Sequence, residues 1–377
     1  MHNSRMMPGL TPSTDVFVIG GGPAGLAAAI AARRRGFAVT VADRSQPPID
    51  KACGEGIMPD GVAAAHAIGI SLEGAGGRPF RGIRFCEGDL AVEAPFPQGV
   101  GFGIRRTALH ELMVERAAQA GVRLLWGTSV SGLEPAGVRV AGQLFRARWI
   151  VGADGVNSAV RRWAGLDASV HHSRRYGFRR HYRITPWSDF MEIHWGPKCQ
   201  IYVTPIAKDE ICVALVSHDP HLRLEFAMSA FPEIASRLSG AEQTSMERGA
   251  TSSTRKLRKV YRDHVALLGD ASGAVDCITG EGLCLSFRQA TALADCFKDG
   301  NLRRYQQKHR ALARRPAFTA RLMLALDWNI PLRQRVMRAF GSDPDLFRRM
   351  LAMHVGELST MELAIGGLSM GCRLLSA

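Results

Sequence analysis

Three glycines, Gly20, Gly22 and Gly25, follow a short apolar strand and begin an alanine-rich helix. At this spacing the first glycine makes a tight turn, the second lets the backbone approach a pyrophosphate, and the third lets the helix pack closely on the strand. The N-terminus of the helix adds a positive partial charge that favours phosphate. Asp43 ends the next strand, about 20 residues further on, where a carboxylate can accept hydrogen bonds from a ribose hydroxyl. We therefore expect a dinucleotide site, which also includes the flanking residues Ala24 and Arg44.

Three later segments carry the residue types of ligand-binding turns. One apolar strand runs into Asp154, and another runs into Asp270. Gly280 and Gly282 flank the start of a helix whose N-terminus can face a ring system. Each segment, taken alone, could equally be the capped start of a helix. Their order along the chain favours a shared role in binding one ligand.

The order of these motifs resembles that of the flavoprotein family of the p-hydroxybenzoate hydroxylase type, which includes aromatic-ring monooxygenases, squalene epoxidases, geranylgeranyl reductases and flavin-dependent halogenases. The resemblance rests on residues 18–36, 150–162 and 265–282 and extends over about residues 14–300. It implies non-covalently bound FAD. Because the chain has a single dinucleotide motif, it also implies that a nicotinamide donor, NAD(P)H, docks transiently.

The resemblance implies roles for individual residues. The glycine motif would bind the ADP part of FAD, Asp43 the adenosine ribose, and Asp270 the ribityl chain. The family more often has Glu at the position of Asp43. The loop at Asp154 would touch both the flavin and the nicotinamide donor. The other cofactor-binding residues implied in this way are Cys53, Gly54, Arg106, Val130, Gly280 and Gly282.

Residues 51–59 (KACGEGIMP) resemble the C-G-E-G segment of the geranylgeranyl reductase branch, which lies beside the isoalloxazine ring. Cys53 and Glu55 are therefore candidate catalytic residues, although Cys53 could also serve only as a small residue that lets the ring approach. Tyr202 is a third candidate, because reductases and halogenases have an aromatic-rich strand at this place. The halogenase motif Trp-x-Trp-x-Ile-Pro is absent from the sequence, so halogenation is not expected.

Hydrophobic periodicity predicts the elements that position these residues. A β-α-β unit combines a strand at 15–19, a helix that ends near Arg35 and a strand at 37–42. An antiparallel sheet is expected from strands at 177–184, 190–195, 199–204 and 210–217. Further strands are expected at 122–126, 128–133, 138–141, 148–152 and 264–268, with helices at 106–120, 221–239, from Gly280 and throughout 301–377.

Together these patterns predict an α/β fold. We expect a Rossmann-like FAD-binding domain of the glutathione reductase type with a parallel sheet, an inserted antiparallel-sheet substrate domain and a helical C-terminal tail. The expected boundaries are 12–170 and 250–300 for the FAD-binding domain, 171–249 with part of 75–105 for the substrate domain, and 301–377 for the tail.

Two histidines in the expected antiparallel sheet could take part in proton transfer. Strand alternation places His181 on one face with Arg179 and Arg183, and His194 on one face with Glu192. Imidazole titrates near neutral pH, so His181 is a candidate acid–base catalyst and His194 could act in the same way. The alternative, which strand positions of this kind favour, is that both histidines face solvent.

Composition narrows the class of protein. The formal net charge is +14, but the 48 lysines and arginines are spread over the chain, so we expect anionic small molecules rather than nucleic acid. The eight cysteines lack C-x-x-C and metal-ligand spacing, which predicts reduced thiols, no metal site and a cytoplasmic protein. No apolar run reaches the roughly 18 residues of a membrane span, and the N-terminal apolar run does not have the pattern of a signal peptide.

These features favour an NAD(P)H-dependent monooxygenase that hydroxylates or epoxidises an aromatic or lipophilic small molecule through a flavin C4a-hydroperoxide. One alternative is an FAD-dependent reductase of C=C bonds in a prenyl lipid, and another is a non-enzymatic basic scaffold. The C-terminal tail could pack on the main body, line a lipophilic pocket or contact a membrane surface peripherally. Its apolar residues Leu322, Met323, Leu326, Ile330, Met337 and Phe340 interleave with the expected surface cations Arg321, Arg333, Arg335 and Arg338.

Overall fold

The computed structural model describes residues 12–358, apart from the side chains of residues 169–173 and 253. Its first sheet has the strand order β18-β19-β11-β1-β2-β8. The strands are β1 (Ser13–Ile19), β2 (Val39–Asp43), β8 (Arg123–Trp126), β11 (Gln143–Gly152), β18 (Tyr261–Arg262) and β19 (Val265–Leu267), with β9 (Val130–Glu134) and β10 (Gly137–Val140) joined to β11 through β10. Strands β1, β2, β8, β11 and β19 are parallel, so their carboxyl ends meet at one edge. The turns that carry Gly20, Asp43, Asp154 and Asp270 all lie at this edge.

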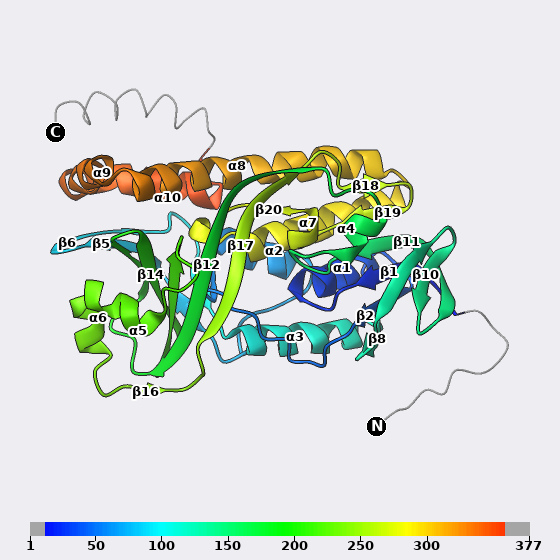
Figure 1. The fold of residues 1–377 in the computed structure, drawn as a ribbon, viewed down its shortest axis with the longest axis horizontal. Helices are drawn as coiled ribbons and strands as arrows, with labels where there is room; N and C mark the ends of the chain where they lie inside the picture. The colour runs from blue at the N-terminus through cyan, green and yellow to red at the C-terminus, as the bar shows by residue number, and fades with distance from the viewer. Residues whose placement is uncertain (1–11, 359–377) are drawn as a thin grey trace.

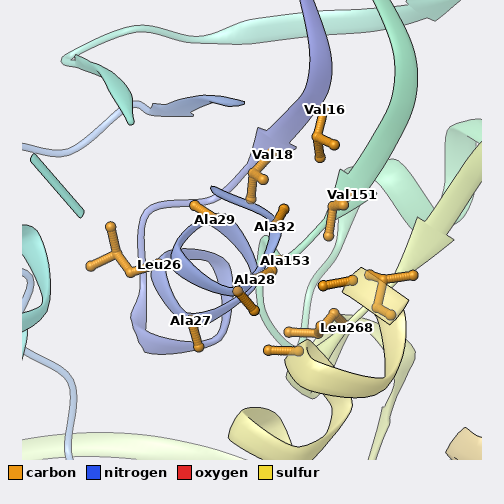
Figure 2. Packing of buried hydrophobic residues seen from close by; sticks show 14 of the residues in the cluster. Val16, Val18, Leu26, Ala27, Ala28, Ala29, Ala32, Val151, Ala153 and Leu268 are labelled. Carbon is orange, nitrogen blue, oxygen red and sulfur yellow. The ribbon is translucent and has the colours of Figure 1, made fainter. Parts of the chain in front are cut away.

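Helix α1 (Pro23–Arg33) packs closely on this sheet because its inner face consists of small side chains. Ala28, Ala29 and Ala32 are buried, and they share a core cluster with Val18 of β1 and Val151 of β11 (Figure 2). On its other side α1 packs against α7 (Gly282–Lys298). The predicted β-α-β unit is confirmed within a few residues at each end.

The second sheet has the order β20-β17-β12-β15-β14-β13-β5-β6, with β16 paired to β12. Its strands are β5 (Gly82–Glu87), β6 (Leu90–Pro95), β12 (Ser169–Arg183), β13 (Phe190–Gly196), β14 (Cys199–Ala207), β15 (Glu210–Ser217), β16 (Glu242–Gln243), β17 (Arg248–Leu257) and β20 (Gly273–Ala274). The expected antiparallel sheet is confirmed for β12 to β15, whereas β13 and β5 are parallel. The sequence did not predict β17, which runs beside the long β12 across the molecule (Figure 1).

The helix predicted at 221–239 is wrong. This segment contains α5 (Leu224–Ala227), a 3-10 turn η1 (Met228–Ala230) and α6 (Pro232–Arg237). Phe231 leaves the helical conformation, and the ring of Pro232 starts a new helix, because proline cannot donate the backbone hydrogen bond that a continuous helix needs. The proline thus divides a segment that was predicted as one helix.

The remaining elements complete the cover around the sheets. They are helices α2 (Pro59–Ala67), α3 (Arg106–Gln119), α4 (Ala159–Trp163), α8 (Leu302–Trp328), α9 (Ile330–Ser342) and α10 (Pro344–Val355), 3-10 turns η2 (Gly269–Ser272) and η3 (Cys277–Thr279), and a small sheet of β3 (Gly56–Ile57), β4 (Arg78–Phe80) and β7 (Gly101–Gly103). Helix α8 runs along the upper side of the view in Figure 1, and α9 and α10 lie beyond it, where both pack on β6.

The α/β class is confirmed, with a mainly parallel and a mainly antiparallel sheet. The glutathione reductase type and the domain boundaries stay predictions. The helical pattern expected after residue 358 lies outside the described residues. Among the described helices, none combines the length and the apolar character of a membrane span.

Candidate functional site

The glycine turn between β1 and α1 is shaped by three different steric constraints. Gly20 has φ +111°, and a Cβ on it would lie 2.4 Å from the carbonyl oxygen of Ala153. A Cβ on Gly25 would lie 1.8 Å from the carbonyl oxygen of Gly20. A Cβ on Gly22, in contrast, meets nothing within 4 Å, and no side chain caps α1 there. The turn is therefore closed on its inner side and open at Gly22, which is where a pyrophosphate can approach free N–H groups.

Asp43 holds this turn from the end of β2. Its carboxylate accepts hydrogen bonds from the backbone N–H groups of Gly21 (2.7 Å) and Ser45 (2.8 Å). Trp126 is the β8 partner of Asp43 in the register, and its ring lies against Gly21. His110 of α3 places Nε2 2.8 Å from the carbonyl oxygen of Gly21, and burial lowers the pKa of this imidazole. The neutral imidazole therefore donates to Gly21.

The sequence analysis did not predict that Trp126 and His110 contact the glycine turn. For Trp126 a signal was present, because it is an aromatic residue at the end of the strand that pairs with β2 beside Asp43. Among the predicted residues of the same region, Ala24 packs against Gly269. Arg44 is exposed beside Asp43, and Val130 is half-buried at the start of β9.

The turns at Asp154 and Asp270 are linked by a buried arginine. Arg161 of α4 is 2% exposed, and its Nη1 donates to the carbonyl oxygen of Ala271, next to Asp270 (3.2 Å). Asp154 caps α4, because Oδ2 accepts from the N–H groups of Ala159 and Val160. One oxygen of Asp154 thus caps a helix, which was the alternative to a ligand-binding role. Its Oδ1 is buried and has no hydrogen-bond partner among the described residues.

Glu55 of the C-G-E-G loop is held by buried polar contacts with residues of α3 and β12. Glu55 has φ +60°, and its carboxylate accepts from the backbone N–H of Arg106 (2.9 Å) and lies 2.7 Å from Nε2 of His181. Arg179 lies on the same strand face as His181, as predicted, with its Nη1 3.3 Å from Nδ1 of that histidine. The solvent-facing alternative for His181 is wrong, since the residue is only 2% exposed.

Cys53 and Gly54 lie on the open side of this loop. Cys53 is partly exposed, and its Sγ accepts a long hydrogen bond from the N–H of Glu55 (3.4 Å). The carbonyl oxygen of Gly54 accepts from Thr204 (2.8 Å), while a Cβ on Gly54 would meet nothing within 4 Å. This geometry leaves room above the loop for a flat ligand. The catalytic roles of Cys53, Glu55 and His181 stay predictions.

His194 also lies inside the protein rather than in solvent, so its solvent-facing alternative is wrong as well. Its Nε2 lies 2.9 Å from Glu192, which also accepts from Trp187 and pairs with Arg84. Burial raises the pKa of Glu192, but the hydrogen bonds from His194 and Trp187 outweigh this effect and lower it overall. His194 therefore belongs to a satisfied polar cluster within the second sheet.

Among the side chains that the structure describes, one group of potential metal ligands is present. Atoms of Glu55, His181 and Cys212 lie within 4.8 Å of one another. The guanidinium of Arg179 already faces Glu55 at 3.6 Å, and burial holds the pKa of the Cys212 thiol well above its usual range. A protonated thiol next to an arginine is a poor environment for a cation.

A narrow apolar cavity of about 30 Å³ lies between the second sheet and the C-terminal helices. Met58, Tyr202 and Thr279 line one side of it, and Met323 of α8 and Phe347 of α10 line the other. The hydroxyl of Tyr202 donates to the carbonyl oxygen of Ile278 (2.8 Å), and burial raises its pKa well above the usual range. Tyr202 is therefore an uncharged wall residue of the cavity, and its catalytic role stays a prediction.

The C-terminal tail divides between packing and lining. Leu322 and Met323 line the cavity, while Leu326, Met337 and Phe340 are buried in the adjoining core cluster. Two expectations are wrong. Ile330 is 48% exposed, because it begins α9 at a helix junction, and Arg333 is buried, where it pairs with Glu87 at 2.6 Å.

The geometry fits an FAD molecule laid along the carboxyl edge of the first sheet. As at Gly22 and Gly54, a Cβ on Gly282, the first residue of α7, would meet no described atom within 4 Å. Gly280 has φ +68° and turns the chain into this helix. The buried Nε of Arg106 has no hydrogen-bond partner among the described residues, as expected of a group that meets a ligand.

Comparison with known proteins gives relatives with several activities. The chain is 33% identical over 189 residues to the menaquinone reductase of Mycobacterium tuberculosis. This alignment covers 47% of this chain and 46% of that protein. It is 36% identical over 174 residues to the 6-methylpretetramide 4-monooxygenase of Streptomyces rimosus, with 41% of each covered. It is 25% identical over 301 residues to the digeranylgeranylglycerophospholipid reductase of Methanocaldococcus jannaschii, with 72% and 73% covered. The first of these matches thus spans about half the length of the relative.

A solved structure and a family model also match this chain. A solved flavoprotein/dehydrogenase from Cytophaga hutchinsonii superposes with a TM-score of 0.78 at 21% identity, covering 91% of this chain and 93% of that one. The family described as FAD binding domain matches residues 13–299. This range holds every glycine turn and carboxylate described above, and the chain belongs to this family of FAD-binding flavoproteins.

Proposed function

We propose that the protein is an FAD-dependent oxidoreductase that reduces C=C bonds in a lipophilic substrate of the prenyl-lipid class. The observation that carries this proposal is the apolar lining of the cavity, whose closed volume of about 30 Å³ must widen to admit an alkyl chain. Met58 follows the C-G-E-G loop and Thr279 precedes Gly280, so the cavity extends between the two segments that the family resemblance assigns to the isoalloxazine ring. Eleven of its lining side chains are Met, Ile, Leu or Phe, which favours an alkyl or isoprenoid chain over a charged acid: Met58, Ile83, Phe85, Met191, Ile193, Ile278, Leu322, Met323, Phe347, Met350 and Leu351.

Two similarities support reduction over hydroxylation. The C-G-E-G segment resembles the reductase branch of the family. The match to the digeranylgeranylglycerophospholipid reductase also extends over 72% of the chain, farther than the match to the monooxygenase. A monooxygenase acting on an aromatic substrate is the second candidate, favoured by the 36% identity to the Streptomyces rimosus enzyme.

In this function, some residues would bind FAD and others would exclude water from the cavity. Bound FAD would supply hydride chemistry at its ring, after reduction by a transiently docked NAD(P)H. The turn at Gly22 would hold the pyrophosphate, with Asp43 toward the adenosine ribose and Asp270 toward the ribityl chain. Gly54 and Gly282 leave the space that a flat ring needs. Helices α8 and α10 close the cavity and keep water from the reacting atoms.

The test uses the purified protein with a geranylgeranylated glycerophospholipid as probe. We expect a yellow protein that releases FAD into the supernatant on acid precipitation and is bleached anaerobically by NADH or NADPH. Anaerobic incubation of the reduced protein with the probe should then add two hydrogen atoms per double bond, as measured by mass spectrometry. Product formation only in oxygen, with the gain of one oxygen atom, would instead establish the monooxygenase.

A further inference from the structure

A carboxyl group is buried directly behind the apolar cavity. Glu281 precedes the first residue of α7, and its side chain is 2% exposed. Neither carboxylate oxygen has a hydrogen-bond partner at normal geometry within the described part of the chain. Its nearest charged neighbours are Arg315 of α8, 3.6 Å from Oε1, and Nδ1 of His354 of α10, 3.7 Å from Oε2. A buried acid with so little compensation requires an explanation.

The nearby arginines are occupied by another carboxylate. Asp60 of α2 receives Arg315 at 2.5 Å and Arg288 of α7 at 3.1 Å, and it also accepts from the thiol of Cys284. The guanidinium of Arg315 also lies against Gly356 at the end of α10, where a Cβ would lie only 1.7 Å from its Nη1. The guanidinium of Arg315 therefore lies closer to Asp60 (2.5 Å) than to Glu281 (3.6 Å), so it stabilises a negative charge on Glu281 only weakly.

The protonation states follow from this arrangement. Burial raises the pKa of Glu281 to about 8 and Asp60 adds to the shift, while Arg315, Arg288 and the hydroxyl of Thr279 oppose it. Burial likewise lowers the pKa of His354 to about 4. At neutral pH the carboxyl therefore carries a proton and the imidazole is neutral. The Nδ1 of His354, which is buried and has no hydrogen-bond partner among the described residues, faces that carboxyl.

His354 connects this acid to the cavity. It lines the cavity, as do Thr279 and the apolar side chains of Ile83 and Phe85 from β5. We propose that His354 is the proton donor to substrate in this cavity and that Glu281 is the residue that positions and reprotonates it. This inference rests on the reductase function proposed above, because reduction of a C=C bond requires a proton as well as a hydride.

Bound reduced FAD would supply the hydride that one alkene carbon needs. The π electron pair of the C=C bond takes a proton from a ring N–H of His354 at the other carbon, and two C–H bonds replace the π bond. As Nε2 of His354 gives up this proton, Nδ1 takes the proton of the Glu281 carboxyl, so that the ring stays neutral. The remaining carboxylate faces Arg315, which stabilises its charge. Uptake of a solvent proton at Nε2 and return of the Nδ1 proton to Glu281 then restore both groups. The electron pair comes from NAD(P)H through the flavin.

The first experiment observes the acid itself, in the holoprotein. Infrared difference spectra over a pH series should contain a carboxylic C=O band that disappears with a midpoint near 8. The band should be absent from Glu281→Gln. Glu357→Gln is the matched control, because Glu357 is exposed and only three residues from His354. A spectrum of Glu281→Gln identical to that of the wild type would overturn the proposal.

The second experiment separates the two half-reactions. We expect Glu281→Gln and His354→Gln to slow reoxidation of the reduced flavin by the geranylgeranylated lipid by about 10²- to 10⁴-fold, the usual contribution of a general acid. Flavin reduction by NAD(P)H should be unchanged, because that step uses neither residue. Glu281→Asp should recover part of the rate. The wild-type rate should fall above pH 8, and this dependence should be missing from Glu281→Gln.

The outcomes distinguish the two proposals. A wild type that reduces the lipid, with Glu281→Gln equally fast, overturns the proton-donating pair and leaves the reductase function standing. A wild type that reduces no prenyl lipid overturns the reductase function and the role of the pair with it, even where the infrared band is present. Loss of FAD or of the native circular dichroism in Glu281→Gln alone, with His354→Gln folded and fully active, assigns a purely structural role to Glu281 and also overturns the pair.

Discussion

The Nζ of Lys51 lies 2.9 Å from Oδ2 of Asp270, and this ion pair joins the segment before the C-G-E-G loop to the turn after β19. Both side chains are more than 40% exposed. Exposed pairs of this kind contribute little to stability, typically about 0–1 kcal/mol. The carboxylate is thus available to a ligand hydroxyl at the point where we expect the ribityl chain.

Asp270→Ala should therefore weaken FAD binding much more than it weakens the fold. Loss of a hydrogen bond to a charged group costs about 1.5–3 kcal/mol, which corresponds to roughly 10- to 150-fold in Kd. Flavin fluorescence titration measures the affinity, and the Tm of the FAD-free protein measures the fold. Lys51→Met is the control, because it breaks the same ion pair but keeps the carboxylate. Equal losses of affinity in both variants would show that the ion pair, rather than Asp270 itself, matters.

Two valine substitutions in the glycine turn should fail for different reasons. Gly22→Val should leave a folded protein that does not retain FAD, because the new side chain enters the space open to the pyrophosphate. Gly25→Val should reduce stability even without FAD, because its Cβ would lie 1.8 Å from a backbone oxygen. Thermal unfolding of both FAD-free variants, beside FAD content after purification, checks this contrast. A yellow Gly22→Val protein would contradict the placement of the pyrophosphate.

The buried arginine of β12 should be important for attachment of the C-terminal helices. Arg175 is fully buried and pairs with Asp327 of α8 at 2.5 Å and with Asp276 at 3.2 Å. Arg175→Met should lower the free energy of unfolding by about 3–5 kcal/mol, because it leaves buried carboxylates without their cation. Urea denaturation measures the loss. The exposed Arg183, on the same strand, provides the matched variant Arg183→Met, for which we expect almost no change.

A buried histidine should make stability depend on acidity. His309 lies 2.9 Å from the hydroxyl of Ser272, and burial lowers its pKa from 6.5 to about 4. The unfolded chain binds the proton more readily, so this stability contribution is complete above pH 6.5 and is lost as the pH falls toward 4. The full loss is about 3 kcal/mol.

His309→Gln isolates this contribution from that of the other titrating groups. The difference in the free energy of unfolding between wild type and His309→Gln should be constant above pH 7 and should shrink steadily toward pH 4. Urea denaturation at several pH values provides the measurement. A difference that does not vary with pH would mean that His309 titrates normally in the folded protein.

Local sequence patterns were enough to predict the glycine turn and the acid beside it. Gly20, Gly22, Gly25 and Asp43 lie within one β-α-β unit of about thirty residues, so local geometry dictates how they meet. The parallel strands then bring Asp154 and Asp270 to the same edge, because every strand in such a sheet presents its carboxyl end there. Periodicity also predicted most of the second sheet, and it failed at Pro232, where a single missing N–H ends a helix.

The surroundings of the apolar cavity, in contrast, depend on contacts between elements that are far apart in the sequence. Strand alternation put His181 and Arg179 on one face but could not tell whether water or protein covers it, since this depends on Glu55, 126 residues away in the chain. Glu281 and His354 likewise come from two helices far apart in sequence that meet only when α10 packs beside α7 and α8. Periodicity records which face of an element is apolar, whereas a buried charge depends on which other element covers that face. The fold brings those partners together, and burial then sets their protonation.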